Sequence, residues 1–568
     1  MRNNLGLPGL AAAALLASCS SGGGRSDAGS GGDPTPVAGL VADGLGSDID
    51  MQTSVTTLSA NWSGFTGNAG PIARYEWAIG KTPQAADIQG WVSVDMATAA
   101  SNTQLSLTVG TKYFVTVHAI DTLGNTSTPV TTDGVEVTGP GGGGGNTLAS
   151  SVGQAGITWQ FDHEYSVGQF CNGDWWVVGP VTIVGITPQC QTVNGRVING
   201  SMINPPITGR QGYDSAMYGI YGGGENSYFP STNVAANLAP GSPLLVQPSS
   251  SLISSVSDPS GGNGFALQSA AVLTVLAVAP PADAFRPGYS GADKTIRYRE
   301  SQLDYGALAM VTPATGAPTM DGTAEQFQRV WLDHCTGWVS QFMHPLQNMP
   351  GYYRDFTALT GTAGLMLNCN YTNAQKRDLL VRFTQIGIDH YGNIVNGLKW
   401  NVNGHCNGRK FPILFAGRVL NDSAMLAAGV TYQAAYFGPG NPNNIATTFA
   451  EDGQTFYVEQ TSPGVYNWGH GGYNATHVGI AEWGNFHTEN PAADDATWDG
   501  NAYRRCCSAN GWVGPCLTMR MMGIQSAWNQ QAWFDYMDRY MQIEENGSWT
   551  EAWVTWHGTM WNTYRAQF

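Results

Sequence analysis

The sequence GPGGGGG at residues 139–145 decides how this chain folds, because it divides the chain into two parts. A run of glycines with one proline buries no side chain and leaves the backbone free to move, so it predicts a flexible linker. The chain has 568 residues, which exceeds the usual size of one domain. We therefore expect separate domains on the two sides of residues 139–150.

Short stretches of alternating apolar and polar residues precede the linker. Leu58, Ala60 and Trp62 alternate with polar residues, and the apolar pattern from Tyr113 to Ala119 ends before a Gly-Asn turn. Period-two alternation bounded by turn residues is typical of half-buried strands. Residues 52–138 are therefore predicted to form a β domain.

This β domain resembles a fibronectin type III domain. Trp62 lies where that family has its core tryptophan, and Leu107 and Tyr113 have the spacing of its tyrosine corner. The resemblance implies a β-sandwich that acts as a spacer or a binding module. We assign no catalysis to it, because a fold alone does not indicate an activity.

Residues 1–19 resemble a bacterial lipoprotein signal peptide. Arg2 precedes a short apolar run, and LASC at residues 16–19 is similar to a lipobox. The apolar run is too short to span a bilayer. The resemblance implies export, lipidation of Cys19 and an anchor in the outer membrane or at the cell surface. Residues 20–51 are rich in Ser, Gly and Asp and predict a disordered tether.

Residues 151–320, after the linker, keep a period close to two. Residues 157–161, 175–178 and 181–184 alternate, with Pro and Gly in the gaps. Residues 270–279 are continuously apolar and end at two prolines, which favours a buried strand over a helix. The expected structure is a second β-sandwich.

Residues 321–568 change to a helical pattern. Thr323 with Gln326 and Thr372 with Gln375 match the capping box of a helix N-terminus. Apolar residues then recur at helical spacing. Helix pairs with long glycine-rich connections predict an α/α array that curves into a closed or partial toroid, with its loops around a cleft. The complete prediction is thus a multidomain β plus α protein.

The charge of the chain limits its partners. The formal net charge is -16 and the pI is about 4.9, whereas nucleic-acid binding requires a basic surface. Only 12% of the residues are charged, and Gly, Ser, Thr, Asn and aromatic residues are abundant. We therefore expect no nucleic-acid partner and favour a hydroxyl-rich ligand such as a polysaccharide.

Cysteine usage favours disulfides over a metal site. Of the nine cysteines, eight remain when Cys19 is set aside, and an even number in an exported chain indicates disulfides. Cys171 and Cys190 are the expected pair, because both fall in one predicted β region. No CxxC pair and no zinc-type histidine spacing occur, so we expect no metal centre and no cofactor. Structural calcium stays open, since oxygen ligands need no sequence signature.

Three polar segments are candidates for a functional site. Residues 466–487 read YNWGHGGYNATHVGIAEWGNFH, and residues 399–410 read KWNVNGHCNGRK. Imidazole, phenol and carboxylate groups are the usual proton-transfer groups, and glycine lets the backbone approach a ligand closely. Arg504, in the third segment at 503–512, could hold a carboxylate with two hydrogen bonds. Alternatively, the histidines are solvated and the arginines pair with nearby aspartates.

The helical region resembles the toroid polysaccharide lyases of the alginate lyase and heparinase II-like kind. Asn403-Gly404-His405 echoes part of an alginate lyase motif that is otherwise absent. In those enzymes Tyr or His removes the proton next to a uronate carboxylate, which Asn, His or Arg neutralises. The resemblance implies a catalytic set of Tyr473, His405, His477, Asn403, Arg409 and Glu482. It implies substrate-binding roles for Trp400, Trp468, Trp483, His487, Lys410, Arg504 and Trp512.

Two other functions remain open. A glycoside hydrolase on the same scaffold would use Glu482 and a second carboxylate, with the two groups roughly 5–10 Å apart. Residues 320–568 contain 14 Lys and Arg against 20 Asp and Glu, and this acidic excess favours a neutral substrate. A non-catalytic glycan-binding or adhesin lipoprotein would use the tryptophans alone.

Overall fold

The computed structural model describes residues 34–46, 48–49, 51–52, 54–108, 111–137, 147–207, 210–216, 228–259, 267–334, 353–400, 407–432, 447–469, 471–483, 508–543 and 552–568. The chain divides into two compact units. The first unit comprises Met1–Asp50, Thr57–Leu105 and Lys112–Val135, and the second comprises Met51–Thr56, Ser106–Thr111 and Glu136–Phe568.

Two sheets form the N-terminal β domain. One has the order β1 (Leu40–Asp43), β3 (Leu58–Ser63), β6 (Ala99–Asn102). The other has the order β2 (Met51–Gln52), β9 (Val135–Val137), β7 (Thr111–Asp121), β4 (Ile72–Gly80), β5 (Gln89–Ser93), with β8 (Val130–Thr131) beside β7. This division of strands is that of a fibronectin type III-like sandwich. Trp62, Leu107 and Tyr113 are all buried, as the resemblance predicts.

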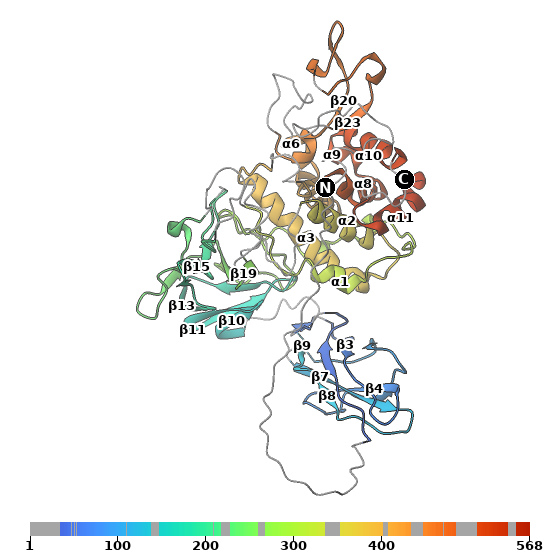
Figure 1. Ribbon diagram of the computed structural model, residues 1–568. Helices are drawn as coiled ribbons and strands as arrows, with labels where there is room; N and C mark the ends of the chain where they lie inside the picture. Colours follow the sequence, from blue (N-terminus) through green and yellow to red (C-terminus); the bar gives the residue numbers. More distant parts are fainter. Residues whose placement is uncertain are drawn as a thin grey trace, which may run out of the picture. The chain divides into compact units, whose positions relative to one another are not determined.

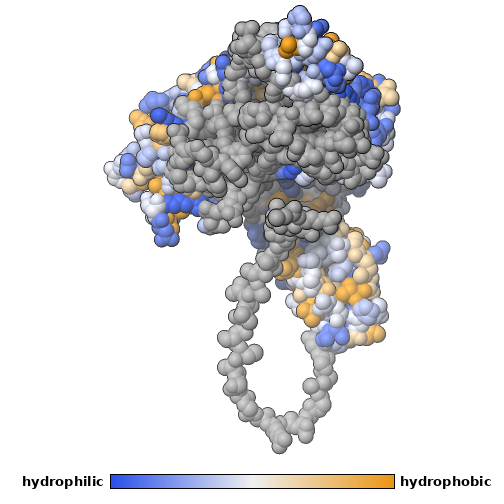
Figure 2. All heavy atoms as spheres, turned by 45° about the horizontal axis from the view of Figure 1, so that its top comes forward, coloured by the Kyte–Doolittle hydropathy of each residue, from blue (hydrophilic) through white to orange (hydrophobic). Residues whose placement is uncertain are grey.

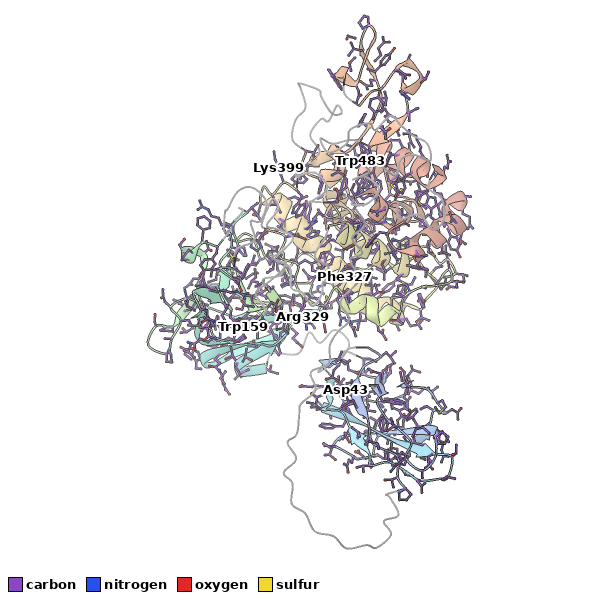
Figure 3. The ribbon with its side chains drawn as sticks, in the orientation of Figure 1. Asp43, Trp159, Phe327, Arg329, Lys399 and Trp483 are labelled. Carbon is purple, nitrogen blue, oxygen red and sulfur yellow. The ribbon has the colours of Figure 1, made fainter. Side chains whose placement is uncertain are left out.

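Eight strands of the second unit form one continuous sheet. Its order is β16 (Ser201–Ile203), β18 (Ser250–Ser257), β19 (Leu267–Leu276), β12 (Trp175–Val178), β11 (Ile157–Gln169), β13 (Val181–Thr187), β17 (Leu244–Val246), with β10 (Thr147–Gln154) on β11. β14 (Gln191–Val193) and β15 (Arg196–Ile198) form a separate hairpin. Trp159 of β11 donates from Nε1 to Ser254 Oγ of β18 at 2.9 Å, although these strands are not neighbours. The sheet therefore curves enough to bring β11 and β18 within hydrogen-bonding distance, where the sequence predicts a sandwich; Figure 3 labels Trp159.

The predicted Cys171–Cys190 disulfide is wrong, because both thiols are free. Cys171 packs into the core of the helical region, and its backbone N–H donates to the Ala284 carbonyl oxygen. Cys190 lies against the second sheet, where its sulfur accepts a hydrogen bond from Asn233. The two cysteines belong to different cores, which their positions in the sequence did not reveal.

The helices follow the second sheet (Figure 1). They are α1 (Met320–Glu325), α2 (Tyr353–Leu367), α3 (Asn373–Val395), α4 (Lys410–Val419), α5 (Ser423–Leu426), α6 (Ala428–Thr431), α8 (Ala509–Met521), α9 (Gln525–Trp528), α10 (Gln531–Ile543) and α11 (Thr555–Tyr564). α2 packs on α8 and α3 packs on α4. Gly361 of α2 meets Gly514 and Pro515 of α8, where a Cβ atom at Gly361 would collide with Pro515. Glycine thus sets the close approach of these two helices.

One of the two capping predictions is confirmed. Thr372 caps α3 and forms a capping box with Gln375. The Thr323 prediction is wrong, because α1 starts earlier and Thr319 is its N-cap. Thr323 lies inside α1, where its hydroxyl donates to the Thr319 carbonyl oxygen at 2.8 Å.

A buried arginine ties the second sheet to the helices. Arg286 donates from Nε to Asp174 at 2.5 Å, and from Nη1 and Nη2 to Asp389 of α3 at 2.9 and 2.6 Å. All three side chains are enclosed. Burial of a charge is costly unless it is paired and hydrogen-bonded, and here every charge has a partner.

Apolar side chains are scattered among hydrophilic ones over the described face shown in Figure 2. Leu148, Leu245 and Val278 are examples of exposed apolar residues. Single apolar residues are normal on a protein surface. Among the described residues, no helix combines the length and the apolar character needed to cross a bilayer.

Candidate active site

A short antiparallel ladder contains part of one of the three candidate segments, residues 466–487. β20 (Thr455–Tyr457) pairs with β23 (Ala481–Trp483), which places Phe456 opposite Glu482. Successive side chains of a strand point to opposite faces, so Glu482 and Trp483 point apart. Each face of the ladder therefore contacts its own set of polar residues. Figure 3 labels Trp483 in this part of the molecule.

The Trp483 face meets the end of the segment at 399–410. Trp483 donates from Nε1 to Gln454 Oε1 at 3.2 Å, and Asn407 donates from Nδ2 to the same oxygen at 3.4 Å. The Gly408 backbone N–H donates to Glu451 Oε1 at 2.6 Å. Two segments that are about 60 residues apart thus reach one turn, residues 450–454.

A buried carboxylate organises the residues beside this turn. Asp333 Oδ1 accepts from Arg409 Nη2 at 2.9 Å, and Asp333 Oδ2 lies 2.7 Å from His390 Nε2. Trp400 donates from Nε1 to the Asp333 carbonyl oxygen at 3.2 Å. The Arg409 guanidinium also lies over the Phe356 ring, 4.0 Å from its centroid. We call Asp333, His390, Trp400 and Arg409 the Asp333 cluster.

Three charged residues next to the Asp333 cluster are also buried: Lys410, Glu451 and Asp452. Lys410 donates from Nζ to Asp452 Oδ1 at 2.5 Å and to the Trp528 carbonyl oxygen. Burial raises the pKa of Glu451 to about 7, although the hydrogen bond from Gly408 opposes this shift. Near neutral pH, Glu451 is therefore a carboxyl group that can hold or release a proton.

The Glu482 face contains a second group of polar residues. Glu482 accepts at Oε1 from the Trp483 backbone N–H at 2.9 Å, and its Oε2 lies 3.6 Å from Arg539 Nη1 of α10. The same Nη1 donates to the Ala481 carbonyl oxygen at 2.6 Å. Burial lowers the pKa of Arg539, while the charges of Glu482 and Tyr473 raise it. Tyr473 is thus within electrostatic reach of the guanidinium.

Tyr473 lies between an aromatic cluster and His477. Its ring centroid is 6.1 Å from that of Phe456 and 5.9 Å from that of His477, edge-on in both cases. The Asn474 backbone N–H donates to His477 Nδ1 at 3.0 Å. Since Nδ1 accepts, the proton of the neutral ring is on Nε2. We call Tyr473, His477, Glu482 and Arg539 the Tyr473 group.

Helix α10 holds the ladder that carries the Tyr473 group. Gln530, just before α10, donates from Nε2 to the Thr455 carbonyl oxygen at 2.7 Å. The Tyr457 hydroxyl donates to Asp535 of α10, and Arg539 follows one turn later. Both strands are therefore fixed to one face of a helix, which is the kind of support that a catalytic side chain needs.

The other predicted site residues have different positions. Trp468 is half-buried in a left-handed turn, with φ of 55°. Trp400, Trp483 and Trp512 are fully enclosed, and Trp512 packs against Trp533. Asn403, His405, His487, Arg504 and Cys19 lie outside the described residues.

The sequence did not reveal Asp333, His390 or Arg539 as site residues. Asp333 and His390 lie in separate apolar stretches and come together only through packing. Arg539 lies on the amphipathic helix α10 and resembles an ordinary surface cation in the sequence. The presence of Glu451 next to Asp452 was a signal for a polar site, but it did not identify partners.

Comparisons with known proteins leave the family of this chain open. No family model and no curated protein matches it. Among solved structures, one described as a myokine is 15% identical, and the match covers 18% of this chain and 95% of that one, with a TM-score of 0.12. The FN1–FN3 domains of chicken CNTN1 are 14% identical, and the match covers 43% of this chain and 66% of that one, with a TM-score of 0.14.

Proposed function

We propose that this protein cleaves a uronate-containing polysaccharide by β-elimination at the Tyr473 group. One observation carries the proposal: Tyr473, His477 and Glu482 come from one glycine-rich segment and share their surroundings with a single arginine, Arg539. A phenol and an imidazole can transfer protons, and a guanidinium can hold a carboxylate. These are the groups that elimination next to a uronate carboxylate requires.

Each member of the Tyr473 group has a role in this reaction. Tyr473 or His477 removes the proton from the carbon next to the substrate carboxylate, and the other group protonates the leaving glycosidic oxygen. Arg539 neutralises the carboxylate while negative charge develops on it, which is where a cation is most effective. Glu482 orients Arg539 from its buried position.

Arg409 fits the neutralising role less well than Arg539. Arg409 is 1% exposed and donates two hydrogen bonds to Asp333, so its charge is matched inside the protein. The Arg539 side chain is 20% exposed, and its Nη1 lies 3.6 Å from Glu482 Oε2. Asn403 and His405 remain candidates of the proposal from sequence alone.

A glycoside hydrolase is the second candidate, and Glu451 favours it. A carboxyl group with a pKa of about 7 is suited to act as a general acid near neutral pH. Glu482, on the neighbouring strand pair, would provide the second carboxylate. Hydrolysis needs two such groups in different environments, one protonated and one ionised.

The proposal includes the finer architecture. We propose that the helical region forms an α/α toroid, closed or partial. The packing of α2 on α8 and of α3 on α4 supports this arrangement. We also propose that the chain is exported and held at the outer membrane or cell surface through lipidated Cys19, with residues 20–51 as a tether.

A glycan panel tests these functions. The detergent-solubilised full chain is incubated with uronate-containing and neutral polysaccharides. Elimination produces an unsaturated uronate, which absorbs in the ultraviolet, together with new reducing ends. New reducing ends without that absorbance would reject the lyase and support the hydrolase. Binding without either product would support a non-catalytic capture lipoprotein instead.

A further inference from the structure

Three aspartates of the first unit converge near the end of strand β1. Asp43 is the last residue of β1, Asp48 lies in the loop that follows, and Asp133 precedes β9 (Figure 3 labels Asp43). One carboxylate oxygen from each of the three lies within 4.8 Å of the others. Asp43 is fully buried, whereas Asp48 and Asp133 are exposed. The group of three carboxylates is therefore enclosed at Asp43 and open to solvent at Asp48 and Asp133.

Asp43 has an oxygen without a hydrogen-bond partner. Its Oδ2 accepts from the Gly134 backbone N–H at 3.0 Å. Its Oδ1 is enclosed and, within the described part of the chain, has no partner. Buried polar atoms are nearly always hydrogen-bonded, and an exception calls for an explanation such as a bound ion. Because Asp43 is 0% exposed, bulk water does not compensate for the missing bond.

Negative charges next to Asp43 add to the cost of leaving its Oδ1 without a partner. One carboxylate oxygen of Asp48 and one of Asp133 lie within 4.8 Å of an oxygen of Asp43, and negative charges this close repel one another. Among the described residues, none of the three aspartates forms a salt bridge with Lys, Arg or His. A cation is therefore the missing counter-charge.

We propose that Asp43, Asp48 and Asp133 bind a divalent cation, with calcium as the expected ion. Calcium prefers carboxylate oxygens and tolerates irregular geometry, and water or backbone oxygens complete its coordination. The three aspartates are hard oxygen ligands without sulfur or imidazole, which excludes a zinc-type donor set. The ion would connect β1 to the turn before β9, which are 90 residues apart in the chain.

Calcium titration calorimetry of the full chain, after removal of metal with a chelator, tests the proposal. Wild type is expected to bind one more equivalent of calcium than Asp133→Asn and Asp48→Asn. If binding persists in these variants, its affinity should be at least about tenfold weaker, since calcium affinity follows the number of charged ligands. Asp95→Asn, which removes an exposed charge from the same unit, is the matched control and should bind like wild type.

The calcium affinities of these variants distinguish a site at the three aspartates from calcium binding elsewhere on the chain. Equal calcium binding by wild type, Asp48→Asn and Asp133→Asn would overturn the proposal, as would no binding by wild type. Loss of binding in Asp95→Asn to the same extent would show a general charge effect and would also overturn it. Asp43→Asn keeps an acceptor for Gly134 and gives a second measurement at the buried end. The result is independent of glycan cleavage, because it is read from binding to the first unit.

Discussion

The Asp333 cluster and the Tyr473 group contain similar residue types in opposite surroundings. Each combines an arginine, a histidine, a carboxylate and an aromatic ring. In the Asp333 cluster every charged partner is enclosed and at hydrogen-bonding distance. In the Tyr473 group the arginine side chain is partly exposed and its ion pair is longer. Residue type alone therefore does not distinguish an enclosed polar network from one that reaches the surface.

Arg409→Met is expected to have the largest effect, on stability. It removes the cation from buried Asp333, and breaking one partner of a buried pair costs about 3–5 kcal/mol. Chemical denaturation of the full chain measures the free energy of unfolding of the second unit. Arg418→Met, in the helix α4 that follows Arg409, is the control and should cost less than about 1 kcal/mol, because its ion pair is partly exposed. Equal losses in both variants would contradict the structural role of the Asp333 cluster.

Glu451→Gln should remove a pH dependence of stability. In wild type, the pKa of Glu451 is about 7 when folded and near 4.5 when unfolded, so the folded state holds its proton more tightly. Stability therefore falls as pH rises from 4.5 to 7, by up to about 3 kcal/mol.

Denaturation at pH 5 and pH 8 tests the Glu451 prediction. The Gln variant should lose less stability between these two pH values than wild type. Glu459→Gln, at an exposed position, should behave like wild type. An unchanged pH profile in Glu451→Gln would show that this carboxyl is ionised in the folded state.

Tyr473→Phe should lower turnover about 100-fold, or about 2.7 kcal/mol in activation free energy, because it removes a proton-transfer group. The unfolding free energy should stay near the wild-type value, since the ring still packs against Phe456. Tyr466→Phe, in the same aromatic cluster, is the control. Wild-type turnover in Tyr473→Phe would remove this residue from the mechanism.

Arg539→Lys should have the smallest effect, about tenfold on turnover. Lysine keeps the charge but loses the planar fork that holds a carboxylate with two hydrogen bonds. Arg539→Gln should lose more activity than Arg539→Lys on the same glycan. If Arg539→Gln cleaves uronate polysaccharide at the wild-type rate, the neutralising role of Arg539 is wrong.

Local signals in the sequence predicted local structure. The Thr372–Gln375 capping box predicted the start of α3, and the apolar run at 270–279 predicted a buried strand, which is β19 up to residue 276, whereas Val278 beyond it is exposed. The prediction from Thr323 was wrong, because Thr319, four residues earlier, is the N-cap of α1. Such competition between neighbouring caps is decided by packing.

Tertiary contacts set what the sequence could not reveal. Trp483 and Asn407 meet at Gln454, a residue that neither candidate segment contains. Arg539 joins the Tyr473 group through the docking of β23 on α10. Cys171 and Cys190 lie in one stretch of β sequence, but they pack into different cores.

The Arg286 bridge limits how this chain can be shortened. A fragment that begins at the first helix would leave Asp389 buried without its arginine partner. A fragment that ends before α3 would leave Arg286 paired with Asp174 alone and would remove both of its hydrogen bonds to Asp389. The curved sheet and the helices are thus inseparable during expression, and recombination between related genes would have to exchange both together.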